Sequence, residues 1–392
     1  MSHLPLFESA LSTLYGPVDA ASLPSPETWT PPERSGGHKG RYLWTDAFGV
    51  LNLLTLHREY TRLNHASNTA KGGDIYLTLA ARLISTVHEV LGRTRDGRSR
   101  LPGASDSNPL GGGLRIGKID ADGPDGDGQY HHYLTLWMFA LNRMSVASGD
   151  RKYNEQAISL AKAIHAPFFV NRGSGKPRMV WKMSMDLDEA LVGSEGNLDP
   201  IDGFVVFRLL QATQKHFGIT TATGEAEAGG DDDVLREEIN DYRRVMDRKG
   251  HHFVSSDPLD LGMTLWTMHW VTNERWTQEI VERCFERVYD LLETSQQLSR
   301  NPKYRLAFRE FGMALGIKCM AAQDPEKERS IDLRSYADQI LESWETAMEV
   351  SLGDEKRDTT PESLRAITRV MFATALIPGA FQRGYFGPEP RL

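Results

Sequence analysis

The sequence predicts a mainly α protein built from paired helices, and three observations support this. Apolar residues recur at intervals of three and four along most of the chain, as in the stripe from Ile75 to Leu91, which places them on one helix face. Strand-like alternation is scarce, and its best example, 178–185, is expected to be a hairpin arm within a loop. Long loops that end in Asp or Gly alternate with short turns, as helical hairpins require.

The elements follow from these patterns in order. Residues 1–40 are expected to form an extended lead-in, because 16–41 are rich in Pro, Gly and Ser. Residues 41–392 are expected to form a single domain. The segment 218–233 is acidic and poor in apolar residues, which is typical of a mobile surface insertion. Helical spacing is found at 46–60, 75–91, 130–141, 152–167, 202–216, 233–247, 260–272, 275–297, 303–321, 333–350 and 362–377.

Composition excludes several classes of protein. The net charge of −8 argues against general binding of nucleic acid or of anionic membranes. The first 20 residues lack the pattern of a secretory signal, and no apolar run is long enough to span a bilayer. Cys284 and Cys319 lie in apolar helical stretches, which favours two buried, reduced thiols over a disulfide. We therefore expect a cytoplasmic protein.

Two motifs that bind phosphate or metal can be set aside. Gly112–Lys118 matches the GxxxxGK of a phosphate loop, but Ile119 follows it and neither a strand nor a helix flanks it as that loop requires. His131-His132 and His251-His252 are adjacent pairs, and neighbours on a helix point about 100° apart. There is no HExxH or CxxC. The sequence predicts no metal site and requires no cofactor.

Aspartates recur where the long loops lead into helices. Asp46, Asp127, Asp202 and Asp260 stand at such positions. Each one alone reads as a helix cap, because Asp is a favoured N-cap and its charge suits the helix dipole. If the hairpins close into a ring, however, these carboxylates surround one mouth, where two of them can serve as general acid and general base or nucleophile.

Aromatic and basic residues accompany the aspartates. Four aromatic residues lie at or beside the long loops, namely Trp44, Tyr130, Tyr133 and Trp181. Rings there either stack on a sugar or belong to the core. Arg115, Lys118 and Lys182 lie in the same loops, and Arg309-Glu310 opens another helix. If the basic residues converge, they hold a carboxylate or phosphate. The alternative is a set of solvated charges and ion pairs.

The residues also carry a family resemblance. "RYLWTDAFGVLNLLTLHRE", "GGLRIGKI", "DGQYHHYLTLWMFALNRMSVASGD", "RMVWKMSMDL", "DPIDGFVVFRLLQAT" and "RLAFREFGMALG" resemble poorly characterised proteins of the six-hairpin glycosidase-like group. The resemblance implies an (α/α)6 toroid of helical hairpins. More remote relatives by fold are unsaturated glucuronyl hydrolases, which use aspartates, and N-acylglucosamine 2-epimerases, which use histidines. In this group His132 falls on an expected His, whereas His131 replaces a Phe.

These observations lead to three functional hypotheses. The first is a glycoside hydrolase acting on a small, sugar-like or anionic substrate, with Asp127, Asp202 and Asp46 as candidate catalytic carboxylates. The second is an isomerase, lyase or cyclase with His132 as the base. The third is a non-catalytic toroid that binds a small molecule or serves as a scaffold. The expected substrate-binding residues are Trp44, Arg115, Lys118, Gln129, Tyr130, Trp181, Lys182, Asp199, Arg309 and Glu310.

Overall fold

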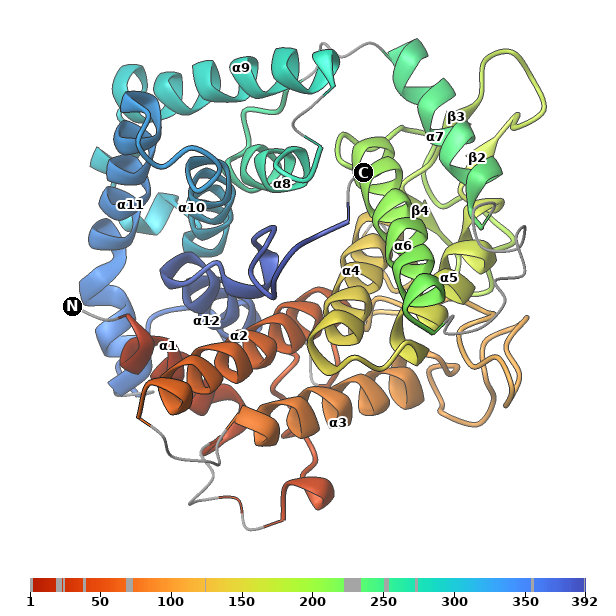
Figure 1. The fold of residues 1–392 in the computed structure, drawn as a ribbon, viewed down its shortest axis with the longest axis horizontal. Coiled ribbons are helices and arrows are strands. Elements are labelled where there is room, and N and C mark those ends of the chain that lie inside the picture. The colour runs from red at the N-terminus through yellow and green to blue at the C-terminus, as the bar shows by residue number, and fades with distance from the viewer. Residues whose placement is uncertain are drawn as a thin grey trace.

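The structure is a computed structural model, and it describes residues 3–18, 23, 25–37, 40–67, 73–123, 125–221, 234–249, 254–271, 274–353, 356–390 and 392. Over these residues the protein is mainly α, as predicted (Figure 1). The α-helices are α1 (Leu4–Tyr15), α2 (Leu43–Ser67), α3 (Gly73–Leu91), α4 (His131–Ser148), α5 (Lys152–His165), α6 (Asp199–Thr221), α7 (Arg236–Lys249), α8 (Pro258–Met268), α9 (Arg275–Tyr289), α10 (Ala307–Ala321), α11 (Glu328–Gly353) and α12 (Glu362–Leu376).

The helices pack in a regular order. Each even-numbered helix contacts the even-numbered helices before and after it, and α12 contacts α2. The odd-numbered helices α3, α5, α7, α9 and α11 each pack on the even-numbered helix that precedes them, while α1 packs on α12 (Figure 1). Long loops, 92–128 and 166–198, lead into the starts of α4 and α6, whereas the three residues 149–151 join the end of α4 to α5.

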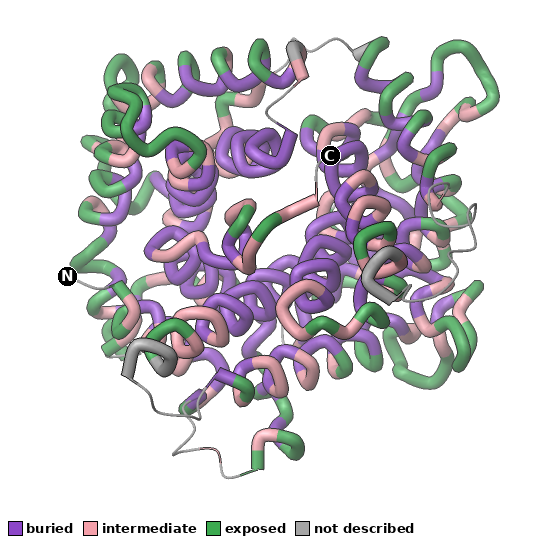
Figure 2. Tube along the Cα trace, viewed as in Figure 1, coloured by how far each residue is buried: buried purple, intermediate pink, exposed green. Residues whose placement is uncertain are grey.

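Burial differs between the two sets of helices. In α4 every residue from Leu134 to Ser145 is buried, because this stretch is apolar almost without interruption. In α3 burial follows a stripe that includes Leu79, Leu83 and Val87, which is the pattern of a helix with one face in solvent. Figure 2 shows the same contrast between buried inner helices and partly exposed outer ones.

A glycine contact brings α8 and α10 unusually close. A Cβ on Gly262 would lie 2.1 Å from the carbonyl oxygen of Gly312, and one on Gly316 would lie 2.0 Å from that of Gly262. Only glycine permits this approach of two backbones. It places the start of α8 beside the start of α10, and so sets Asp260 near Arg309.

The lead-in differs from the prediction. Residues 4–15 form helix α1 rather than extended chain, because Phe7, Leu11 and Leu14 make a buried stripe at helical spacing. The predicted insertion at 218–233 lies outside the described residues except for 218–221, which belong to α6. The pair His251-His252 also lies outside them.

Four two-residue strands lie in the loops. β1 (Gln129–Tyr130) pairs antiparallel with β4 (Lys182–Met183), and β2 (Phe169–Val170) pairs antiparallel with β3 (Arg178–Met179). The predicted strand-like segment 178–185 thus supplies two short strands. The β1–β4 pair ties the loop before α4 to the loop before α6.

The segment that follows α12 fills the space between the later parts of the even-numbered helices. It begins with a short helix at Gly379–Phe381, drawn in dark blue at the centre of Figure 1. The Phe381 ring lies 4.8 Å from that of Phe48 and 5.5 Å from that of Trp266. Farther along, Glu389 forms a buried ion pair with Arg143 at 2.6 Å.

Candidate functional site

A cavity of about 350 Å³ lies where the beginnings of the even-numbered helices meet. Leu198, directly before α6, lines it together with residues from or next to the starts of the other five. Four of the lining residues were predicted to be functional, and these are Trp44, Lys118, His132 and Arg309. Asp260 was noted as a helix-start aspartate and Tyr133 as an aromatic residue beside a long loop, whereas Tyr42 and Thr45 were not singled out. The other lining residues are Gly36, Leu198, Leu259, Phe308, Ser363, Leu364 and Ile367.

His132 and Asp199 form a polar pair at this cavity. Asp199 Oδ1 lies 3.3 Å from Nδ1 of His132 and accepts a hydrogen bond from the His132 backbone N–H at 3.1 Å. Burial disfavours a charge on His132, but Asp199, Asp202 and Asp260 outweigh this and raise its pKa above the usual value. Because Nδ1 faces Asp199, Nε2 is the nitrogen that His132 offers to a substrate.

Two further carboxyl groups lie near His132 and differ in position. Asp202 is buried and lies 2.8 Å from the hydroxyl of Thr267. Burial, with Asp199 and Asp260 nearby, raises the pKa of Asp202 to about 8. Asp260 lines the cavity, and burial together with the charge of Asp257 raises its pKa. Both groups therefore hold a proton more readily than ordinary aspartates do.

Aromatic side chains form one wall of the cavity. The hydroxyls of Tyr42 and Tyr133 are 2.7 Å apart, and the Tyr133 ring lies 5.0 Å from Trp44 and 4.8 Å from His132. Trp44 Nε1 and the Thr45 hydroxyl are buried without a hydrogen-bond partner among the described residues. Such a wall is suited to packing against a ring, and unsatisfied buried donors are frequent at functional sites.

Two cations also line the cavity. Lys118 reaches it from the loop before α4, and Arg309 reaches it from the first turn of α10. Arg309 forms an ion pair with Asp257, which caps α8 by accepting hydrogen bonds from the backbone N–H groups of Leu259 and Asp260. The starts of α10 and α12 have no side-chain cap. Their positive dipole ends and the two cations favour an anionic group in the cavity.

Asp127 does not line the cavity, and it does not cap α4, whose N-cap is Tyr130. Its carboxylate forms ion pairs with Arg95 at 2.8 Å and with Arg115 at 3.1 Å. It also accepts hydrogen bonds from the backbone N–H groups of Gly117 and Lys118. The stretch that resembles a phosphate loop thus binds a carboxylate of its own chain. These contacts occupy both Asp127 and Arg115 in holding the loop.

Four other predicted binding residues support the loops around the cavity instead of lining it. The Gln129 amide bridges the backbone at Gly112, Leu114 and Met185. Lys182 is buried 5.3 Å from the centre of the Tyr130 ring, and burial lowers its pKa. The ring of Trp181 lies edge-on to that of Tyr130 at 5.2 Å, and its indole N–H donates to Ser194.

Asp46 and Glu310 take part in buried ion pairs. Asp46 lies 3.3 Å from the Arg41 guanidinium and accepts from the backbone N–H of Tyr42. Burial raises the pKa of Asp46 to about 6, although Arg41 opposes this. Glu310 accepts hydrogen bonds from Arg305 and from the Trp344 indole. Neither carboxylate lines the cavity. Glu310 fits the ion-pair alternative, whereas for Asp46 the sequence offered a helix cap and the structure adds the ion pair with Arg41.

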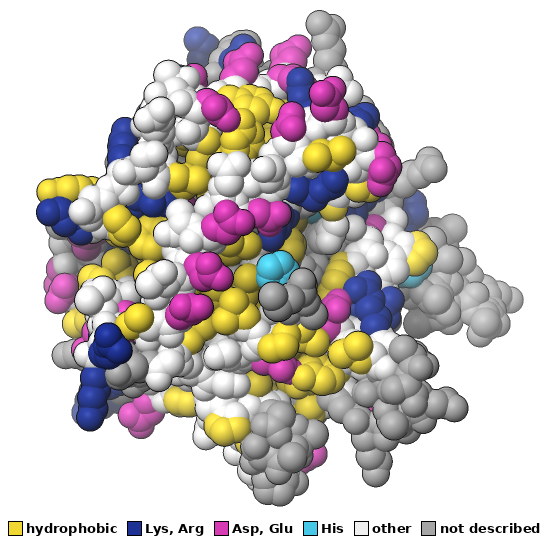
Figure 3. All heavy atoms as spheres, turned by 90° about the vertical axis from the view of Figure 1, so that its left-hand side faces the viewer, with side chains coloured by type: hydrophobic (Ala, Val, Ile, Leu, Met, Phe, Trp, Pro, Cys, Tyr) yellow, Lys and Arg dark blue, Asp and Glu magenta, His cyan; other side chains and the backbone are white. Residues whose placement is uncertain are grey.

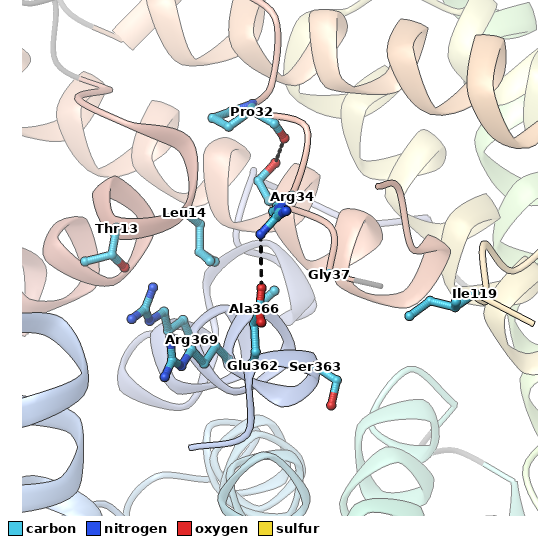
Figure 4. Close-up of a pocket in the computed structure, with 12 residues that line it drawn as sticks. Thr13, Leu14, Pro32, Arg34, Gly37, Ile119, Glu362, Ser363, Ala366 and Arg369 are labelled. Carbon is cyan, nitrogen blue, oxygen red and sulfur yellow. Dashed lines mark hydrogen bonds and ion pairs between the residues drawn. The ribbon is translucent and has the colours of Figure 1, made fainter. Parts of the chain in front are cut away.

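Two other hollows lie on the surface. One of about 390 Å³ lies between α1, the loop 32–37 and α12, and the exposed ion pair Arg34–Glu362 crosses it at 3.2 Å (Figure 4). The second, of about 370 Å³, lies between α1, α11 and α12. Its acidic residues belong to α11, on the face with several acidic and apolar side chains in Figure 3. These acidic residues are Asp338, Glu342, Glu345 and Glu349.

Some general properties can be stated for the described part of the chain. No group of three or more His, Cys, Asp or Glu side chains there is placed to hold a metal ion. No helix in it combines the length and the apolar character needed to cross a bilayer. Cys284 and Cys319 are both buried and unpaired, as predicted, and burial raises the pKa of Cys284 to about 12.

Comparisons with models of protein families, with curated proteins and with solved structures found no match to this chain. Function is therefore inferred from the geometry of the cavity.

Proposed function

We propose that the protein is an enzyme that transfers protons on a small, sugar-like substrate, with His132 as the general acid or base. The observation that carries this proposal is the His132–Asp199 pair at the edge of the cavity. A carboxylate on Nδ1 fixes the orientation of the imidazole and leaves Nε2 for the substrate. Asp199 and its neighbours raise the pKa of His132 and so favour the protonated imidazole more than in a free histidine, which suits a group that donates as well as accepts a proton.

The reaction class that fits best is isomerisation, elimination or cyclisation. These reactions need a base and an acid within reach of one small substrate. Asp260 is the second titratable group that lines the cavity, and its raised pKa suits it to donate a proton. The two groups come from different helices, α4 and α8, and are thus suited to act on different atoms of the substrate.

The cavity also limits the substrate. Its volume of about 350 Å³ is at the small end of ligand pockets. Trp44 and Tyr133 offer ring faces to a sugar-like body, while Lys118 and Arg309 favour a carboxylate or phosphate substituent. We therefore infer an anionic monosaccharide-like metabolite as the substrate.

A glycoside hydrolase is the second candidate, and one observation favours it. The pKa of Asp202 is raised to about 8, so this carboxyl is protonated at neutral pH, as a glycosidase general acid must be. Asp260 would then act as its partner carboxylate. Thr267 contacts Asp202, and Asp202 is not among the residues that line the cavity, which makes His132 the better-placed group.

We further propose that the helices form an (α/α)6 toroid, in line with the sequence resemblance. The contacts among α2, α4, α6, α8, α10 and α12 return from α12 to α2, which supports a closed inner ring. The unpaired thiols of Cys284 and Cys319 support a reducing compartment such as the cytoplasm.

Turnover of a library of sugar acids and sugar phosphates, followed by mass spectrometry, tests this function. We expect the wild-type protein to convert a library member to a product of equal mass or to one that has lost water. His132→Gln is expected to lower the rate by at least about 100-fold. His216→Gln is the matched control, because His216 is exposed in the later part of α6.

Other outcomes of the same assay separate the rival functions. Cleavage of a glycoside that needs Asp202 and Asp260 but tolerates His132→Gln would establish the hydrolase and overturn the proton-transfer proposal. Binding of a library member without turnover, unaffected by His132→Gln, would indicate a non-catalytic binding protein.

A further inference from the structure

Two adjacent histidines face one carboxylate oxygen at the starts of α4 and α6. Nδ1 of His132 lies 3.3 Å from Oδ1 of Asp199, and Nδ1 of His131 lies 3.4 Å from the same oxygen. The two side chains differ in exposure. His132 lines the cavity, whereas His131 is fully buried and packs against Phe168. A substrate therefore meets only His132, and any effect of His131 passes through Asp199.

His131 is in turn held by an outer helix. The hydroxyl of Tyr242, on α7, lies 2.7 Å from Nε2 of His131. Tyr242 reaches this position because α6 has glycine at position 203, where a Cβ would lie between 2.2 and 2.7 Å from atoms of the Tyr242 ring. Gly203 directly follows Asp202 in "DPIDG". One motif thus supplies Asp199, Asp202 and the gap that admits Tyr242.

These contacts assign the proton on His131. Nδ1 of His131 is buried without a well-aligned hydrogen bond, so its contact with Asp199 at 3.4 Å is electrostatic. We place the ring hydrogen of His131 on Nδ1, because this nitrogen faces the carboxylate oxygen. Nε2 then accepts a hydrogen bond from the Tyr242 hydroxyl. Because the Nδ1–H groups of both histidines approach Oδ1 of Asp199, the attraction that Asp199 exerts on His132 is shared with His131.

We propose that Tyr242 and His131 are positioning residues that set the protonation of His132 through Asp199. His131 draws on the negative charge that would otherwise favour a proton on His132, and Tyr242 keeps His131 in the tautomer that does so. The charged groups around His132 also include Asp202 on α6, Asp260 on α8, and Lys118 and Arg309, which line the cavity with it. Two titratable tyrosines face His132 as well, with the rings of Tyr133 and Tyr130 at 4.8 Å and 5.9 Å from its own. His165 lies close enough to interact electrostatically with His131. The inference explains how the protonation of His132 is adjusted for the proposed proton transfer, and it therefore rests on the proposed function.

NMR titration of the His132 ring in the full chain tests the proposal without an assay of turnover. The His132 signal is identified by its loss in His132→Gln. In His131→Phe the midpoint of the titration is expected to rise by about half a pH unit or more, because Asp199 then acts on His132 alone. Tyr242→Phe is expected to shift it in the same direction by a smaller amount.

Tyr385→Phe is the matched control, because Tyr385 is also a buried tyrosine but its hydroxyl bonds Glu59 instead. Its His132 midpoint should equal that of the wild type. An unchanged midpoint in both His131→Phe and Tyr242→Phe would overturn the proposal. Tyr242→Phe removes only one hydroxyl and decides the question if His131→Phe does not fold. A shifted midpoint in a protein without turnover would uphold the tuning and count against the proposed function alone.

Discussion

The two ends of the even-numbered helices are chemically opposite. At their beginnings, polar side chains surround a cavity, and several of them carry shifted pKa values or lack a partner. Toward their far ends, the segment after α12 fills the space, and its main charge is neutralised by Arg143. The same helices thus support both ends. Among the described residues, both ends hold buried polar atoms without a hydrogen-bond partner, such as Trp44 Nε1 at the first and Glu389 Oε2 at the second, but the cavity lies at the first. This difference locates function more securely than any single aspartate does.

The far end of the even-numbered helices, which the segment after α12 fills, is called the closed end, and the end with the cavity is called the open end. At the closed end the buried charges are paired with each other. Arg143 is fully buried there, 2.6 Å from Glu389 and 4.8 Å from the centre of the Trp270 ring. Its Nε also donates to the side-chain oxygen of Asn142. A charge so completely paired has little left to offer a substrate. We therefore expect changes at this end to affect stability and to leave chemistry at the open end intact.

The largest effect on stability is expected from Arg143→Met. This change leaves the Glu389 carboxylate buried without a counter-ion, which typically costs about 3–5 kcal/mol. Urea unfolding followed by tryptophan fluorescence measures the loss. The double variant Arg143→Met/Glu389→Met should recover much of the loss, because it removes both charges. A loss below about 1 kcal/mol in the single variant would show that the ion pair does not hold the closed end together.

Asp127→Asn is expected to have the next largest effect, again on stability. The amide keeps the shape but removes the charge that pairs with Arg95 and Arg115, and we expect a loss of about 2–4 kcal/mol. The two arginines are partly exposed, which keeps the cost below that of Arg143→Met. If Asp127 were instead the catalytic carboxylate that the sequence suggested, the same change would abolish turnover without unfolding the protein. Parallel measurement of unfolding and turnover distinguishes the two expectations.

Asp127 also shows what a sequence can and cannot predict. Helical spacing predicted all the helices except α1, because burial of an apolar stripe is encoded locally. Helix α1 was missed because the Pro- and Gly-rich stretch after Tyr15 led to one assignment, extended chain, for all of residues 1–40. Phe7, Leu11 and Leu14 nevertheless have helical spacing. The strand-like pattern at 178–185 was recognised as well, and it pairs within the loops.

The candidate site was harder to predict, because a carboxylate at a helix start can form an ion pair, cap the helix or line a cavity. Asp46, Asp127, Asp202 and Asp260 look alike in sequence, yet Asp46 pairs with Arg41, Asp127 pairs with Arg95 and Arg115, and only Asp260 lines the cavity. Partners such as Arg95 and Thr267 are set by tertiary packing, and nothing in the local pattern identifies them. Tyr133 had a local signal, since it lies in the same "QYHHY" as His132.

A smaller effect, visible only as a pH dependence, is expected at the open end from Asp202→Asn. Because burial raises the pKa of Asp202 to about 8, the folded protein holds this proton between about pH 4 and 8 while the unfolded chain has released it. Stability therefore falls as pH rises through this range. Asp202→Asn lacks this titration. Its free energy of unfolding should therefore rise relative to that of the wild type by about 1 kcal/mol for each unit of increasing pH.

Urea unfolding at several pH values between about 5 and 8 measures this trend. Asp106→Asn serves as the control, because that side chain is 97% exposed and should give a difference that does not change with pH. A constant difference for Asp202→Asn as well would mean that Asp202 is ionised in the folded protein. The second candidate function would then lose its general acid.

The smallest effect, a shift along the pH axis, is expected from Asp199→Asn. The amide still accepts the hydrogen bond from the His132 backbone, but it removes the negative charge that raises the pKa of His132. The His132 titration should move to lower pH by about one unit. If His132 acts as a base, the acidic limb of kcat/KM moves with it, because the neutral imidazole then persists to lower pH. Asp257→Asn should leave the limb in place, since Asn caps α8 equally well. If the acidic limb does not move in Asp199→Asn, His132 is not the catalytic base. The open end would then lose the catalytic group that distinguishes it from the closed end.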